Sequence, residues 1–194
     1  MSLTPREYRE LITGSILVPD ADTQSPDLAQ LFTPATHRNA LDPDVTLVVG
    51  SRGAGKTVWF KSLQSNSHRE LAASAYQLPK LSLAKVTAGY GAELAVGSYP
   101  GPGMLTQLLN ERFDPEIIWQ SVCLNALSHE TPNGQSWVDR VRFLTEDPAY
   151  FETEIEVIDR SSENNRLILF DALDRMSRSV ADTEKLVGGL FRVV

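Results

Sequence analysis

The chain has 194 residues, of which 42% are hydrophobic and 22% charged, and its formal net charge is −7. This composition suits one soluble globular domain. It excludes collagen-like, mucin-like and wholly disordered chains, which need extreme glycine, proline or charge content. The single cysteine, Cys123, excludes an intramolecular disulfide framework, and no apolar run approaches the ~20 residues that span a bilayer. We therefore expect a soluble, cytoplasmic protein.

Residues 1–44 are expected to form an N-terminal extension, followed by a main domain over residues 45–194. Prolines punctuate the extension, so its helices, around Pro5–Thr13 and Pro26–Phe32, are expected to be short. The main domain opens with Val45–Val49, an unbroken run of β-branched and aliphatic residues. This run predicts a fully buried strand of a parallel sheet.

A glycine-rich turn at Gly50–Gly55 and a helix from Lys56 to about Gln64 are expected to follow this strand, with Val58, Trp59 and Leu63 facing inward. The later segments show helical periodicity, loop composition or short apolar runs. They predict helices at Glu70–Leu78, Pro115–Leu127, Trp137–Leu144, Pro148–Ile158 and Asp182–Val194, strands at Leu83–Tyr90 and Leu167–Phe170, and a loop at Gly97–Gly103. Asp182 or Thr183 is expected to cap the last helix.

The segment GSRGAGKT, from Gly50 to Thr57, matches the pattern G-x-x-x-x-G-K-[ST]. Its glycines let successive N–H groups point at phosphate oxygens, and the following helix adds its positive N-terminal dipole. Lys56 is expected to bridge the β- and γ-phosphates, and the Thr57 hydroxyl to hold Mg²⁺. Arg52 either contacts phosphate or faces solvent. The expected nucleotide-binding residues are Gly50, Ser51, Arg52, Gly53, Ala54, Gly55, Lys56 and Thr57.

A second motif, RLILFDALDR, covers Arg166 to Arg175. Four apolar residues followed by Asp171 are typical of a Walker B strand, whose carboxylate reaches Mg²⁺ through its water shell. Asp174 is a candidate for polarising the attacking water. Each acid also has a purely structural interpretation: Asp171 as the cap of a turn, and Asp174 as a helix cap or an ion-pair partner of a nearby arginine.

The two motifs together resemble the P-loop ATPases of the AAA+/STAND assemblage, most closely the KAP- and NACHT-type modules. That resemblance implies an α/β fold with a three-layer P-loop NTPase core around a parallel sheet. It also implies ATP and Mg²⁺ as ligands, Asp171 in the metal role and Asp174 in the water-activating role. The chain departs from many KAP-type motifs at Ala172, where they have a second aspartate.

In such ATPases a further strand, later in sequence, lies between the Walker A and Walker B strands and carries a polar sensor residue. Only about one helix follows Asp174, so the sheet is expected to be incomplete. We therefore expect either the N-terminal part of a longer ATPase or a chain completed by a partner, including a homo-oligomer that supplies an arginine in trans. An unpaired sheet edge and the apolar C-terminal segment favour association.

Three functions are compatible with the motifs. The first is an ATPase in which MgATP hydrolysis drives or regulates a conformational switch in a larger assembly. The second is a nucleotide-sensing scaffold that binds ATP without hydrolysing it, and the third, less favoured, is a small-molecule kinase, since no arginine-rich lid is visible between Gly89 and Asp171. No segment predicts a membrane anchor or a nucleic-acid readout element.

The remaining candidate residues carry no clear site. His37, His68 and His129 lack metal-ligand spacing and are interpreted as surface or capping residues. Cys123 and Trp59 are interpreted as core residues, although Trp59 could alternatively stack on adenine. Tyr90 and Tyr99 are further candidates for a contact with the base through the glycine-rich loop, although nothing in the sequence selects them.

Overall fold

The computed structural model describes residues 31, 33–91, 97–127, 136–160 and 165–194. The helix expected around Pro5–Thr13 lies outside these residues, as does all of the helix expected around Pro26–Phe32 except Leu31. His129 also lies outside them.

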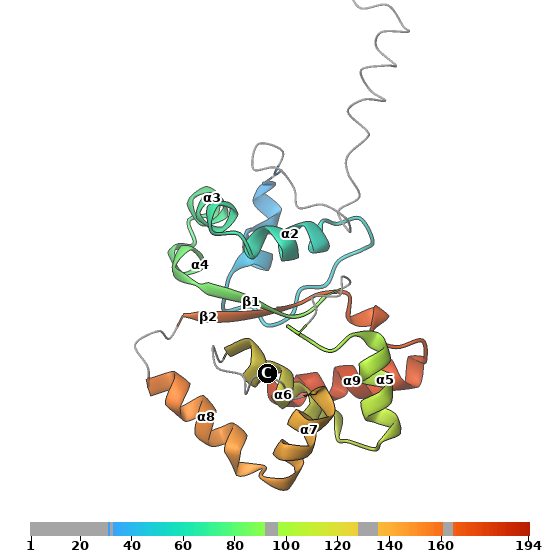
Figure 1. Ribbon diagram of the computed structural model, residues 1–194. Coiled ribbons are helices and arrows are strands. Elements are labelled where there is room, and N and C mark those ends of the chain that lie inside the picture. Colours follow the sequence, from blue (N-terminus) through green and yellow to red (C-terminus); the bar gives the residue numbers. More distant parts are fainter. Residues whose placement is uncertain (1–30, 32, 92–96, 128–135, 161–164) are drawn as a thin grey trace, which may run out of the picture.

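A parallel pair of strands forms the centre of the described structure (Figure 1). Strand β1 (Lys85–Tyr90) pairs with β2 (Arg166–Phe170), and the register runs from Lys85 opposite Arg166 to Tyr90 opposite Phe170, with one irregularity after Ala88. Both strands were predicted. The side chains of β2 are half-buried.

One face of the sheet is covered by α2 (Lys56–Leu63), α3 (Asn66–Tyr76) and α4 (Pro79–Leu83), together with the short 3-10 helix η2 (Ala35–Leu41). Their buried side chains form what we call the α2-side cluster. Its buried members are Leu41, Trp59, Leu63, Ala72, Ala73, Tyr76, Leu78 and Leu81, and Leu167 and Leu169 of β2 pack against them. Alternate residues of β2 therefore attach these helices to the sheet.

The opposite face is covered by α5 (Pro102–Asn110), α6 (Pro115–Leu127), α7 (Trp137–Glu146), α8 (Ala149–Arg160) and α9 (Val180–Val193). The buried members of this α6-side cluster are Tyr90, Tyr99, Leu105, Leu108, Ile118, Trp119, Val122, Val141, Met176, Leu186 and Leu190. Ala88 and Phe170 of the sheet pack against them. The Trp119 indole N–H donates to the Leu186 carbonyl at 2.7 Å, which ties α6 to α9.

Helices therefore lie on both faces of the sheet. Since the sheet has only two strands within the described residues, the three-layer P-loop core stays a prediction.

The predicted buried strand at Val45–Val49 is wrong. These residues form no strand, and Val45, Leu47, Val48 and Val49 are 43%, 54%, 42% and 84% exposed. An apolar run becomes a buried strand only when a neighbouring strand pairs with its backbone, and β2 pairs with β1 alone among the described strands.

Several helix ends differ from the prediction. Helix α9 begins at Val180, where the Ser179 hydroxyl accepts a hydrogen bond from the Asp182 N–H, so Ser179 is the cap in place of Asp182 or Thr183. The expected loop at Gly97–Gly103 ends earlier, because α5 starts at Pro102.

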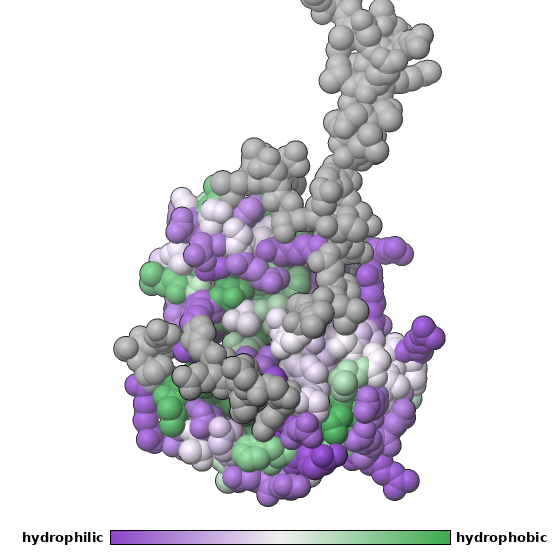
Figure 2. Space-filling model, viewed as in Figure 1, coloured by the Kyte–Doolittle hydropathy of each residue, from purple (hydrophilic) through white to green (hydrophobic). Residues whose placement is uncertain are grey.

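The surface has a mixed character: Figure 2 shows apolar patches on the described surface that are interrupted by polar side chains. In the part of the chain that the structure describes, no helix has the length and apolar character needed to cross a bilayer.

Candidate nucleotide site

The glycine-rich loop has a backbone that its glycines make possible. Gly53 and Gly55 have φ values of +81° and +85°, in the left-handed region that L side chains rarely adopt. A Cβ at either position would meet open space, so the backbone conformation and not crowding requires glycine there. The Ala54 N–H donates to the Ser51 carbonyl at 3.2 Å and closes a turn within the loop.

Lys56 opens helix α2, and its side chain turns back over the loop. Its Nζ donates to the carbonyl oxygens of Gly50 and Ser51, at 2.6 and 3.0 Å. The N-cap residue of α2 is Gly55, and no side chain accepts a hydrogen bond from the first N–H groups of the helix. These N–H groups are therefore available to an anion, and the helix dipole also favours negative charge at this point. The loop and Lys56 are exposed, which leaves this arrangement accessible from solvent.

Asp171 follows β2 directly and is anchored to the neighbouring strand. Its N–H donates to the Tyr90 carbonyl at 2.9 Å. Its Oδ2 is buried, and none of the described residues gives it a hydrogen bond. A buried carboxylate oxygen without a donor is unusual, because buried polar atoms are normally paired. This oxygen therefore fits a role as a ligand for a cation or for a cation-bound water.

The backbone bends immediately after Asp171. Ala172 has φ +55°, a left-handed conformation that costs a residue with a Cβ about 1 kcal/mol and suits glycine, asparagine or aspartate better. The chain then enters η3 (Leu173–Arg175), where Asp174 is exposed. The loop before α2 and the segment after β2 lie at the same end of the sheet in Figure 1.

Three aromatic residues considered for base stacking lie in the core. Trp59 is 8% exposed and belongs to the α2-side cluster. Tyr90 and Tyr99 belong to the α6-side cluster, with ring centroids 5.7 Å apart. Burial, with smaller contributions from Tyr99 and Asp174, raises the pKa of Tyr90 to about 12. These positions support the core interpretation of Trp59 and do not favour the two tyrosines as base contacts.

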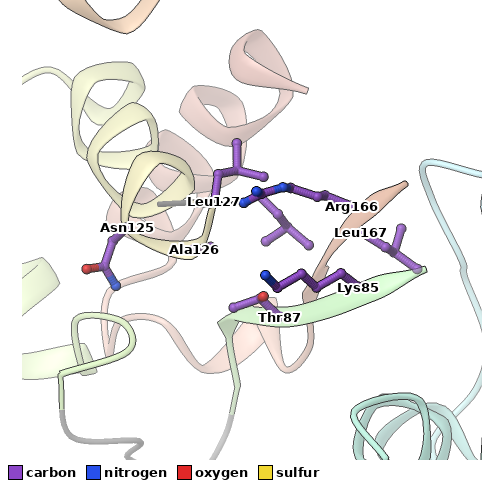
Figure 3. Close-up of a pocket in the computed structure, with 8 residues that line it drawn as sticks. Lys85, Thr87, Asn125, Ala126, Leu127, Arg166 and Leu167 are labelled. Carbon is purple, nitrogen blue, oxygen red and sulfur yellow. Dashed lines mark hydrogen bonds between the residues drawn. The ribbon is translucent and has the colours of Figure 1, made fainter. Parts of the chain in front are cut away.

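A separate hollow of about 180 Å³ lies near the amino ends of the strands, and no residue of the glycine-rich loop lines it (Figure 3). Lys85 and Arg166 extend into it from β1 and β2, and the last turn of α6 forms its other wall. Arg166 Nη1 donates to the Leu127 carbonyl, the last of α6. The two cations therefore complement the negative end of a helix, a structural role that accounts for them.

Mg²⁺ fits the residues expected to hold it. Thr57 lies in the first turn of α2, and Asp171 offers the buried Oδ2. Within the described ranges, no group of three His, Cys, Asp or Glu side chains could hold a metal ion. Mg²⁺ bound with a nucleotide does not need such a group, because it takes most of its ligands from phosphates and water.

No family model, curated protein or solved structure matches the chain. The functional interpretation therefore depends on the residues themselves.

Proposed function

We propose that the chain is an ATP-binding P-loop module that hydrolyses ATP with Mg²⁺ and thereby drives or regulates a conformational switch in a larger assembly. One observation carries this proposal: the backbone is left-handed at Gly53 and Gly55, and Lys56 follows directly as the first residue of α2. Such a loop offers N–H donors, an ammonium group and a helix dipole to one anion. Asp171 and its buried oxygen support the metal role.

The reaction assigns separate tasks to the residues of this site. The loop and Lys56 bind the β- and γ-phosphates and offset their charge, with Lys56 moving from the Gly50 and Ser51 carbonyls to the phosphates. Mg²⁺, when bound, neutralises charge on the same oxygens. Asp174 orients a water and accepts its proton as the water oxygen attacks the γ-phosphorus. The bond to the β–γ bridging oxygen breaks, and ADP leaves with its electron pair.

We also propose that the site is completed by a further element, either another segment, a partner protein or a second copy of the chain. Two observations support this. Strand β2 has a partner strand on one side only among the described residues, and the run Val45–Val49 exposes its apolar side chains. An unpaired strand edge favours pairing with an added strand, and an exposed apolar run favours burial against another element. We further place the protein in the cytoplasm, which suits the free thiol of Cys123.

The test is calorimetric titration of MgATP into the wild-type chain, Lys56→Ala and Lys80→Ala. Lys80 also carries one positive charge but lies on α4 in an exposed pair with Asp44, so Lys80→Ala controls for the change in net charge. We expect binding to be lost in Lys56→Ala only. Equal binding by the wild type and Lys56→Ala would refute the proposal.

A phosphate-release assay then separates the three candidate functions. Release of phosphate without an added acceptor favours an ATPase. ADP formation that depends on an acceptor favours a kinase, and binding without turnover favours a sensing scaffold.

A further inference from the structure

A hydrogen bond outside the candidate site joins η2 to the first turn of α2. Trp59 Nε1 donates to His37 Nδ1 at 2.9 Å, and the two rings meet edge to face with centroids 6.2 Å apart. Trp59 lies three residues after Lys56, and its backbone N–H donates to the Gly55 carbonyl at 3.0 Å. A single residue therefore connects η2 with both the end of the glycine-rich loop and the start of α2.

The segment around η2 is also fixed to α3. Arg38 Nε donates to the Tyr76 carbonyl and the Tyr76 hydroxyl donates to the Pro34 carbonyl, each at 3.0 Å. The rings of Trp59 and Tyr76 pack edge to face, 6.0 Å apart. Because these contacts hold η2 in place, His37 presents its acceptor to Trp59 from a fixed position.

The bond requires a neutral His37. The indole N–H can only donate, and a protonated imidazole carries an N–H on both nitrogens and can no longer accept. Trp59 is 8% exposed, so water replaces the lost acceptor poorly, and a buried donor left without a partner destabilises the arrangement that buries it.

Three elements meet around His37: its own η2, α2 with Trp59, and α3 with Tyr76. The ionisable groups of the packed elements are Arg38 on η2, Lys56 and Lys61 on α2, and His68, Arg69, Glu70 and Tyr76 on α3. Glu70 is the one acid on these three elements, and it is exposed.

We propose that His37 is a positioning residue for the phosphate loop: its neutral ring, acting through Trp59, holds the start of α2 in the conformation that binds MgATP, and its protonation weakens that binding. This inference rests on the proposed function and adds a pH response to it. Histidine in general changes its charge between about pH 5 and 8, and the experiment is therefore designed around that range.

The experiment measures the dissociation constant of MgATP near pH 7.5 and near pH 5.5, values that bracket histidine titration. The wild type is compared with His37→Asn, whose amide oxygen can accept the indole N–H at both pH values, and with His37→Ala, which cannot accept it. His68→Asn is the matched control, because His68 is a histidine of α3 whose Nδ1 is hydrogen-bonded to the hydroxyl of Ser65, the N-cap of that helix. Protonation of the nucleotide itself affects every variant equally.

We expect acidification to weaken binding about fivefold more in the wild type and in His68→Asn than in His37→Asn. His37→Ala should bind about fivefold more weakly than the wild type near pH 7.5. The indole ¹⁵N–¹H resonance of Trp59, assigned by its loss in Trp59→Phe, should shift on acidification in the wild type but not in His37→Asn.

Two results would overturn the inference in different ways. If His37→Asn shows the same pH dependence as the wild type while Lys56→Ala still abolishes binding, the positioning role is refuted and the proposed function stands. If the wild type fails to bind MgATP at either pH, the proposed function falls, and this inference falls with it.

Discussion

Two neighbouring glycines of α9 should respond in opposite ways to the same substitution. A Cβ at Gly188 would meet nothing within 4 Å, whereas a Cβ at Gly189 would lie 2.5 Å from Pro115 Cβ, 2.6 Å from the Pro115 carbonyl carbon and 2.9 Å from the Glu116 nitrogen. Both glycines lie inside α9, so alanine gains the same helix propensity at each, about 1 kcal/mol. The difference between the two variants therefore measures the close contact alone.

The start of α6 cannot easily move away from a new methyl group. The Glu116 N–H is bonded to Asp114 Oδ1 at 2.9 Å, and Arg192 of α9 contacts Glu116 Oε2 and Asp114 Oδ1 at 2.7 and 3.3 Å. Overpacking of this kind costs about 1–3 kcal/mol. We expect Gly188→Ala to raise the free energy of unfolding by about 1 kcal/mol relative to the wild type. The free energy of unfolding of Gly189→Ala should be about 1–3 kcal/mol lower than that of Gly188→Ala.

Urea denaturation followed by circular dichroism measures both values, and an unchanged m-value confirms that the difference is one of native-state stability. If Gly189→Ala is as stable as Gly188→Ala, the reasoning about close packing between α9 and the start of α6 is refuted.

Three further predictions concern individual residues. Thr57→Ala should weaken nucleotide binding more with Mg²⁺ than without it, and equal losses under both conditions would exclude the metal role. Asp174→Asn should lower the rate of phosphate release by about 10²-fold or more while MgATP still binds, and a normal rate would remove Asp174 from the mechanism. Burial raises the pKa of the Cys123 thiol to about 12, so a thiol reagent near pH 8 should react with it only on unfolding; rapid labelling of the native protein would contradict its buried position.

Elements whose pattern is local could be predicted well from the sequence. Helix α6 has the predicted bounds Pro115–Leu127, and α2 begins at Lys56 as expected. Strands β1 and β2 lie within two residues of their predicted ends. In each case the apolar spacing or run agrees with the partner that the fold supplies, so local and long-range preferences coincide.

Helices α4 and α5 were not predicted, and the start of α5 was included in the loop that the composition of Gly97–Gly103 indicated. Helix α4 starts at Pro79 and α5 at Pro102, and in both the proline occupies the first turn, where its missing N–H costs no helical hydrogen bond. The signal was therefore present in the sequence. Proline before a short apolar segment indicates a helix start as well as a loop.

The candidate site was predictable only in part. The glycine pattern located the loop, and two of its glycines, Gly53 and Gly55, have a left-handed backbone that favours this residue. Two contacts could not be predicted, because each joins segments that are far apart in the chain. The Asp171 N–H reaches the carbonyl of Tyr90, and Trp59 reaches His37, 22 residues before it. No local pattern encodes either pairing.

The two halves of the candidate site are attached to the fold in different ways. Asp171 is an extension of β2 and is bonded to β1 through Tyr90, so the sheet fixes it directly. The glycine-rich loop follows an exposed segment that pairs with no described strand. It is fixed from its far end by α2, whose Trp59 and Leu63 belong to the α2-side cluster against which Leu167 and Leu169 of β2 pack. The position of Lys56 relative to Asp171 therefore depends on how α2 is held. This is why a single hydrogen bond from Trp59 to His37 of η2 is expected to affect nucleotide binding.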